Sequence, residues 1–197
     1  MPGIDDMGVA NADHGICGFT STLYMVHKHR PALHAYLDRA LGDQEGMRDT
    51  RLQAEIKTFL RMMQAKGAGR LLKEIQELTS SFPGYKQWRI ESYIDRINRR
   101  QADADYSIAM PPRAVAEYVR TMWQMRAYIE DRDVPGDAIL GLTRTGMVNR
   151  WKNLAHYVFR DRNGRLYSWG EQFDDLAAVN AAKGRDYSVV HRIMLHG

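Results

Sequence analysis

The stretch "LAHYVFRDRNGRLYSWGEQF", residues 154–173, decides the fold class of this chain. Two runs rich in aromatic and β-branched residues flank the dipeptide Asn163-Gly164. Such runs favour strands, and an Asn-Gly pair tolerates the positive φ angles that a tight hairpin turn requires. The sequence therefore predicts a β-hairpin across residues 154–173.

Further strands and one helix are expected around this hairpin. The apolar run "AILGL" at 138–142 and the run "YSVVHRIML" at 187–195 are typical of buried strands. After the hairpin, "DDLAAVNAAKG" at 174–184 has the composition of a short helix that ends at Gly184. The last third of the chain should thus form a small antiparallel sheet with one helix.

The chain before residue 137 is dominated by apolar residues at helical spacing. Helices followed by strands predict an α+β fold, in which an N-terminal helical part packs on a small C-terminal antiparallel sheet. The length fits a single domain over 1–197, with a helical insertion at about 45–132. The expected helices cover about 17–41 (bent at Pro31), 52–63, 70–78, 88–97 and 111–129.

Composition and charge narrow the function classes. One cysteine excludes an intramolecular disulfide and a multi-cysteine zinc site. The net charge of +4 comes from bases interleaved with acids, whereas a nucleic-acid groove would more often show an unbroken basic stripe. No apolar run reaches the roughly 18 residues of a membrane span, and the first residues lack the pattern of a signal peptide. We therefore expect no nucleic-acid partner, no membrane span, and synthesis in the cytoplasm with export left to a signal-independent route.

The histidines of the first predicted helix offer a metal site as an alternative. His27 and His34 share a helix face but lie about 10 Å apart along the axis, and His29 faces elsewhere. Zinc needs ligands that converge at about 2 Å. We expect a polar helix face with one or two packed histidines there instead, and no metal or other cofactor.

The only cysteine lies in "HGICGFTS", residues 14–21, where the first helix begins. Free N–H groups and the helix dipole at such an end stabilise a thiolate, so a nucleophilic Cys17 should be alkylated well below pH 8. Gly15 lets the incoming chain approach at unusual angles, and Gly18 leaves room over the sulfur for a substrate carbonyl. A lone cysteine is also commonly a buried apolar residue, so the choice depends on whether a base is near.

The predicted hairpin supplies that base in His156. If Asn163 and Gly164 are the two turn residues, His156 faces Glu171, and Trp169 projects from the same face. Glu171 would then fix the tautomer of His156 and steady its imidazolium form.

A longer turn, in which Asp161 faces Arg165, is the alternative register. Asp161 points away from His156 in both registers and is expected to serve the turn. The longer turn places Gly170 opposite His156. Other residues are then the nearer candidates for the third group: Gln172, Trp169 and Asp174.

These residues resemble the papain-like cysteine peptidase superfamily, in which a cysteine on an N-terminal helix is followed by a histidine on a strand and an acid or amide on the next. The blocks "HGICGFTS" and "AHYVFRDRNGRLYSWG" (155–170) are most similar to compact bacterial effector proteases and papain-fold toxins delivered into other cells. The resemblance implies a papain-like fold and a cysteine hydrolase (protease, amidase or deamidase) that works through a thioester intermediate. The helical stretch at about 45–132 has no counterpart in it.

The resemblance also implies roles for single residues. Cys17 would be the nucleophile, His156 the general base and acid, and Glu171 the orienting acid. The oxyanion would be held by the Cys17 N–H and by Asn11, which holds the position of the superfamily's side-chain amide. Asp13 and His14 are alternatives to Asn11 as the second oxyanion donor. Gly18 and Trp169 would contact the substrate.

The expected partners follow from this assignment: a protein or peptide substrate and, for an exported toxin, a cognate chaperone or immunity protein. A non-catalytic binding or adaptor protein, such as an immunity-type partner, is the competing interpretation. The 11 methionines and 10 tyrosines could line an interaction surface, although helical spacing places most of them in the core.

Overall fold

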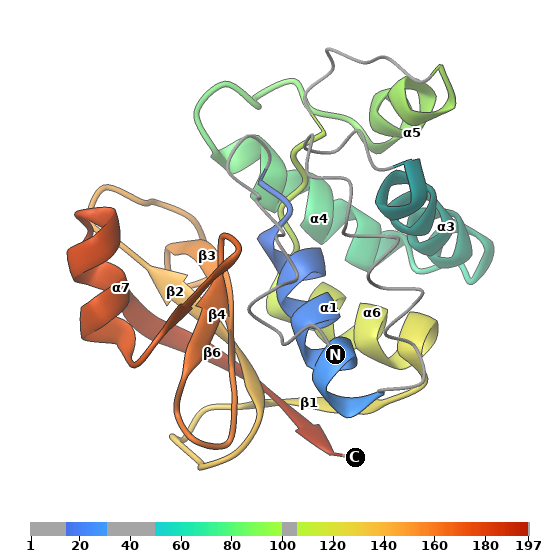
Figure 1. Ribbon diagram of the computed structural model, residues 1–197. Coiled ribbons are helices and arrows are strands. Elements are labelled where there is room, and N and C mark those ends of the chain that lie inside the picture. Colours follow the sequence, from blue (N-terminus) through green and yellow to red (C-terminus); the bar gives the residue numbers. More distant parts are fainter. Residues whose placement is uncertain (1–14, 31–49, 100–105, 197) are drawn as a thin grey trace.

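In a computed structural model of the chain, residues 15–30, 50–99 and 106–196 are described. They form six helices and one six-stranded antiparallel sheet, which confirms the α+β class. Figure 1 shows α1 between the sheet and the helices α3 to α5, with α6 beside α1 and also packed against β1 and β6, while α7 lies on the other side of the sheet. The helices are α1 (Cys17–His29), α3 (Thr50–Ala65), α4 (Gly69–Ser81), α5 (Ile90–Asn98), α6 (Pro112–Trp123) and α7 (Leu176–Lys183). The strands are β1 (Arg126–Glu130), β2 (Ala138–Thr143), β3 (Leu154–Arg160), β4 (Leu166–Ser168), β5 (Glu171–Phe173) and β6 (Ser188–His196).

The strand order is β1-β6-β2-β3-β4-β5, so the last strand of the chain lies inside the sheet. β6 pairs with β1 on one side and with β2 on the other. The sheet separates two apolar clusters. Ile139, Tyr157 and Phe159 pack with the helices α1 to α6, whereas Leu140 and Val158 pack on the α7 side.

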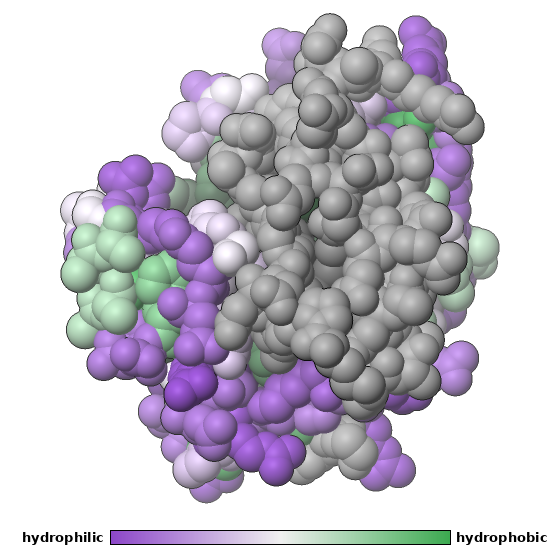
Figure 2. Space-filling model, in the orientation of Figure 1, coloured by the Kyte–Doolittle hydropathy of each residue, from purple (hydrophilic) through white to green (hydrophobic). Residues whose placement is uncertain are grey.

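Helix α7 covers the second face of the sheet. The carboxylate of Asp175 accepts the N–H of Ala178 at 2.8 Å and so begins the helix, and Gly184 ends it in the left-handed conformation. The expected short helix at 174–184 is therefore confirmed. Figure 2 shows apolar atoms over α7, whose outer side carries small exposed alanines.

Strand β1 was not expected from the sequence. The spacing predicts a helix from Pro111 to Ile129, but α6 ends at Trp123 because Gln124 adopts the left-handed conformation at φ 52°. Ile129 then pairs with Ile193 in the sheet. The helical prediction for 124–129 is wrong because sheet pairing with β6 overrides the local spacing.

The other helices follow the expected pattern with shifted ends. The predicted helices at 52–63 and 70–78 are present as α3 and α4, and α5 begins at Ile90, after Trp88. The first helix ends at His29, and the remainder of its expected range, 31–41, lies outside the described residues. Within the described ranges, no helix is both long and apolar enough to cross a membrane.

The hairpin adopts the longer of the two registers. Asp161 donates its N–H to the carbonyl of Arg165 at 2.9 Å, and Arg160 pairs with Leu166. The Asp161 carboxylate accepts the N–H groups of Asn163 and Arg165 at 2.8 and 3.0 Å, which satisfies the turn backbone. The expectation that Asp161 serves the turn is confirmed, and the two-residue turn at Asn163-Gly164 is wrong.

A second tight turn divides what the sequence presents as one strand. Ser168 and Glu171 pair across the turn residues Trp169 and Gly170, which have φ angles of 54° and 75°. Positive φ at both central residues is typical of a two-residue hairpin turn. The expected continuous strand at 165–173 is therefore wrong, and this turn decides where the residues of the candidate site lie.

Candidate active site

The start of α1 is held by the segment 106–110. The N–H of Gly15 donates to Ser107 Oγ at 2.8 Å, and the N–H of Ile108 donates to the Gly15 carbonyl at 3.2 Å. Tyr85 in turn donates its hydroxyl to Ser107 Oγ at 3.1 Å. These bonds fix the chain just before Cys17, the first residue of the helix.

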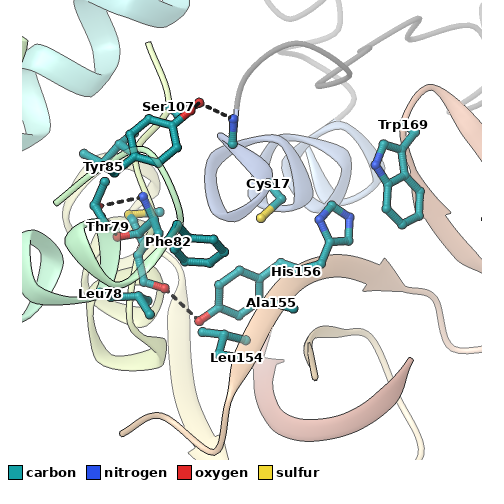
Figure 3. A pocket seen from close by; sticks show the side chains of 15 residues that line it. Cys17, Leu78, Thr79, Phe82, Tyr85, Ser107, Leu154, Ala155, His156 and Trp169 are labelled. Carbon is teal, nitrogen blue, oxygen red and sulfur yellow. Dashed lines mark hydrogen bonds between the residues drawn. The ribbon is translucent and has the colours of Figure 1, made fainter. Parts of the chain in front are cut away.

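The side chains of Cys17 and His156 line one cavity of about 260 Å³. Cys17 is half-buried at the helix start, and His156, on β3, is 8% exposed. Figure 3 shows the Cys17 side chain between Phe82 and His156, with Trp169 on the far side of the imidazole. The structure thus brings together the predicted nucleophile and the predicted base from positions 139 residues apart in sequence (156 − 17).

His156 is held on two sides. Its Nε2 lies 2.8 Å from Ser168 Oγ, and the indole of Trp169 stacks on its ring with a centroid separation of 4.1 Å and an interplanar angle of 8°. Gly170 donates its N–H to the Tyr24 hydroxyl at 3.0 Å, so helix α1 also fixes the turn that carries Trp169. The predicted neighbourhood of Trp169 and His156 is present.

Glu171 does not face His156. The turn at Trp169-Gly170 places Glu171 on β5 opposite Ser168, where its exposed carboxylate accepts a hydrogen bond from Lys183. The expected His156–Glu171 contact required the shorter register and an unbroken strand, and the structure has neither. Ser168 is the residue that bonds to His156.

The other candidates for the third group lie elsewhere. Asp174 is exposed, Gln172 pairs with Tyr167 across β4 and β5, and Asp161 is engaged in the turn. Ser168 was missed by the sequence reasoning. The Trp-Gly dipeptide after it was the available clue, since a glycine that ends a two-residue turn stops the strand at Ser168.

Burial keeps both reactive groups uncharged. Desolvation by the surrounding protein raises the pKa of the Cys17 thiol to about 11, although the N–H groups of Tyr157, Gly18 and Cys17 itself oppose this rise. Burial lowers the pKa of His156 to about 3, and the positive charge of Lys183 adds to that shift. The helix start was expected to lower the thiol pKa, but the cost of burying a thiolate outweighs it. At neutral pH the pair is a thiol beside a neutral imidazole.

Gly18 serves packing at the back of α1. A side chain at this position would meet Met110 Cε at 3.0 Å and Val115 Cγ2 at 3.3 Å, so the missing side chain lets α1 approach these residues. Gly18 is buried, and the cavity lining includes Gly15 instead. We expected Gly18 to leave room over the sulfur for a substrate, and this expectation is wrong: the missing side chain makes room for Met110 and Val115.

The expected second oxyanion donor, Asn11, and its alternatives Asp13 and His14 lie outside the described residues. So does His34, one member of the histidine set considered for a metal. Of the other two, His27 is buried and His29 Nε2 lies 2.9 Å from Asp137. Among the residues with described positions, no group of three or more His, Cys, Asp or Glu could hold a metal ion.

No protein-family model, curated protein or solved structure matches this chain.

Proposed function

We propose that this chain is a cysteine hydrolase of papain-like type, of the kind that bacterial effectors and toxins carry. The observation that supports it best is that Cys17 and His156 line one cavity while Ser168 and Trp169 hold the imidazole in place. A nucleophile, a base and a group that orients the base are the parts that covalent acyl transfer requires.

In the proposed reaction, His156 accepts the thiol proton as the sulfur attacks the substrate carbonyl. With the ring proton on Nε2, directed to Ser168, the lone pair of Nδ1 is left for the thiol. The pair is neutral at rest, so proton transfer and attack belong to one step. His156 then protonates the leaving group, and a thioester on Cys17 remains for a water molecule that His156 activates.

Backbone N–H groups beside the sulfur are suited to hold the oxyanion. The N–H groups of Cys17 and Gly18 belong to the first turn of α1, where N–H groups have no acceptor within the helix, and both lie close enough to the sulfur to affect its pKa. Donors fixed by the fold stabilise developing charge without reorganisation. The Cys17 N–H therefore keeps its proposed role, with Gly18 contributing through its backbone.

The test is covalent labelling by a peptidyl vinyl sulfone, measured by intact-protein mass spectrometry. The chain has one cysteine, so a single adduct reports on Cys17 alone. Replacing the base, His156→Ala, should slow labelling by about 100-fold or more. His191→Ala is the matched control, because His191 is also a strand histidine, but it is half-buried and bonds to the Trp151 carbonyl. Equal labelling rates in the two variants would contradict the proposal.

One observation favours the non-catalytic binding protein as a second candidate. The high thiol pKa and the low imidazole pKa are also what a buried structural cysteine and histidine would show. A binding protein would keep its full biological activity after Cys17→Ser, whereas a hydrolase would lose it. That substitution changes one atom in a half-buried side chain and should leave the fold intact.

A further inference from the structure

The cavity beside Cys17 is walled by the helical stretch that the family resemblance does not cover. Its lining joins α4, the turn after α4 and the segment 106–110 to the start of β3. Figure 3 shows these walls on the side of Cys17 that faces away from Trp169. The apolar side chains of the wall are Leu78, Phe82, Ile108, Met110 and Leu154.

The polar groups of this wall are already engaged within the protein. Thr79 Oγ1 accepts the Ala109 N–H at 3.0 Å, and the Tyr157 hydroxyl donates to the Met110 carbonyl at 2.9 Å. Ser107 is bonded to Gly15 and Tyr85, as described above. Among the described lining residues, Cys17 and His156 included, none has a side chain charged at neutral pH. A charged ligand group would lose its hydration there without gaining a partner.

We infer that this wall selects substrates with a large apolar side chain on the acyl side of the scissile bond, and that the site cleaves peptide bonds and does not deamidate glutamine. The inference rests on the proposed function and chooses among its reactions. A peptide carbonyl at the sulfur carries its residue's side chain next to it, where the cavity begins. A glutamine side-chain carbonyl has only two methylene groups before it and leaves an apolar cavity of about 260 Å³ unfilled.

The selected reaction is a balanced acyl transfer. The bond from Cys17 Sγ to the acyl carbon forms as the peptide C–N bond breaks, and the thiol proton leaves with the amine through His156. Water then adds to the thioester, releasing the new carboxyl group and restoring the thiol. No electron donor or acceptor is needed.

Phe82 is the position at which this selectivity can be changed with least risk to the fold. It is half-buried in the turn after α4, so a charged side chain there can still reach solvent. Phe82→Glu should favour lysine or arginine in the peptide, and Phe82→Lys should favour aspartate or glutamate. Leu72→Glu and Leu72→Lys are matched controls, since Leu72 is half-buried on α4 but does not line the cavity.

The experiment incubates wild type and variants with a defined mixture of peptides and follows cleavage by mass spectrometry and ammonia release by assay. We expect peptides with Leu, Met or Phe at one acyl-side position to be cleaved at least about tenfold faster than peptides with Ala there. Both Phe82 variants should instead cleave peptides with the oppositely charged residue faster than those with Leu, Met or Phe. Both Leu72 variants should keep the wild-type preference for the apolar peptides. No variant should release ammonia.

The failures are distinguishable. Cys17-dependent cleavage without side-chain preference, or with a preference unmoved at Phe82, overturns this inference and leaves the hydrolase intact. The inference is also overturned, and the hydrolase proposal kept, if Cys17 releases ammonia from glutamine peptides or hydrolyses only a fatty-acyl thioester. Absence of both turnover and vinyl sulfone labelling overturns the hydrolase itself.

Discussion

The indole of Trp169 lies nearly parallel to the imidazole of His156, with ring centroids 4.1 Å apart. Trp169 has a φ of 54°, a backbone conformation that few non-glycine residues adopt, and the Tyr24 hydroxyl holds the next residue in place. The turn therefore presents the indole as a cover on the base. This arrangement explains why His156 is buried although it lies near the start of β3.

Removing that cover should return the base toward its ordinary pKa. Trp169→Ala exposes the imidazole, and because burial is the main cause of its low pKa, we expect the pKa of His156 to rise from about 3 toward 6.5. NMR titration of the imidazole resonances measures this directly. Trp151→Ala is the control, since the Trp151 side chain is half-buried elsewhere and stacks with Arg150. An unchanged His156 titration in Trp169→Ala would contradict the assignment of burial as the cause.

The neutral pair predicts an unusual response of the thiol to pH. A thiol of pKa about 11 has few thiolates at pH 7, so iodoacetamide alkylation should be slow and should accelerate about tenfold per pH unit between pH 6 and 9. In urea the thiol should regain its ordinary pKa, and the curve should level off near pH 9. A rate in the folded protein that is already constant below pH 8 would show a preformed thiolate and contradict the neutral pair.

The same pKa values set the pH profile of any hydrolysis. Below the His156 pKa of about 3 the base is protonated and cannot accept the thiol proton, and above the Cys17 pKa of about 11 the thiol proton is gone. The ratio kcat/KM should therefore be flat from about pH 4.5 to 9.5 wherever circular dichroism shows the fold intact. A decline centred near pH 6.5 would show that His156 titrates as an exposed histidine.

Ser168, and not Glu171, should matter for the orientation of His156. Ser168→Ala removes the partner of Nε2 and should lower kcat/KM about tenfold, the effect of one hydrogen bond of about 1.4 kcal/mol. Ser168→Thr keeps a hydroxyl and should restore most of the rate. Glu171→Gln is the contrast, because that carboxylate is exposed and paired with Lys183. A larger loss from Glu171→Gln than from Ser168→Ala would restore the acid as the third group.

Sequence patterns predicted the elements of this protein better than their registers. The apolar runs correctly predicted three strands of the sheet, and the helical spacing of apolar residues predicted most of the helices. Both patterns follow from the periodicity with which side chains are buried. The turn at 161–165 depends on one carboxylate, Asp161, that bonds to two backbone N–H groups and lengthens the loop beyond the Asn-Gly pair. A shift of one residue in a hairpin changes every facing pair, which is how Glu171 came to be predicted beside His156.

The candidate site was predictable only in part for the same reason. Cys17 and His156 were found because their residue types are rare and chemically specific. Ser168 is a common residue whose position depends on the Trp169-Gly170 turn, and the cavity wall around Leu78 and Phe82 depends on how the helices pack. Strand β1 was missed because its pairing with β6 joins segments more than 60 residues apart, with Glu130 opposite Arg192.

Asp137 provides a test of stability away from the candidate site. Its carboxylate is 8% exposed and is bonded to Lys28, at the last turn of α1, with His29 Nε2 at 2.9 Å. Burial opposes ionisation, but the hydrogen bond and charge of Lys28 lower the pKa of Asp137 below its usual value. This contribution to stability is present above the unfolded pKa of 3.8 and is lost as the pH falls through the folded value.

Lys28→Met should therefore destabilise the protein by about 1–3 kcal/mol at pH 7, because it leaves a buried carboxylate without its main partner. Urea unfolding measures the loss, and the difference from wild type should shrink as the pH falls through the pKa of Asp137, since protonation removes the buried carboxylate charge that Lys28 pairs with. Arg132→Met breaks the pair with Glu130 on an arginine that is 84% exposed, and it should cost less than about 0.5 kcal/mol. If both substitutions cost the same, Lys28 contributes no more than a surface charge.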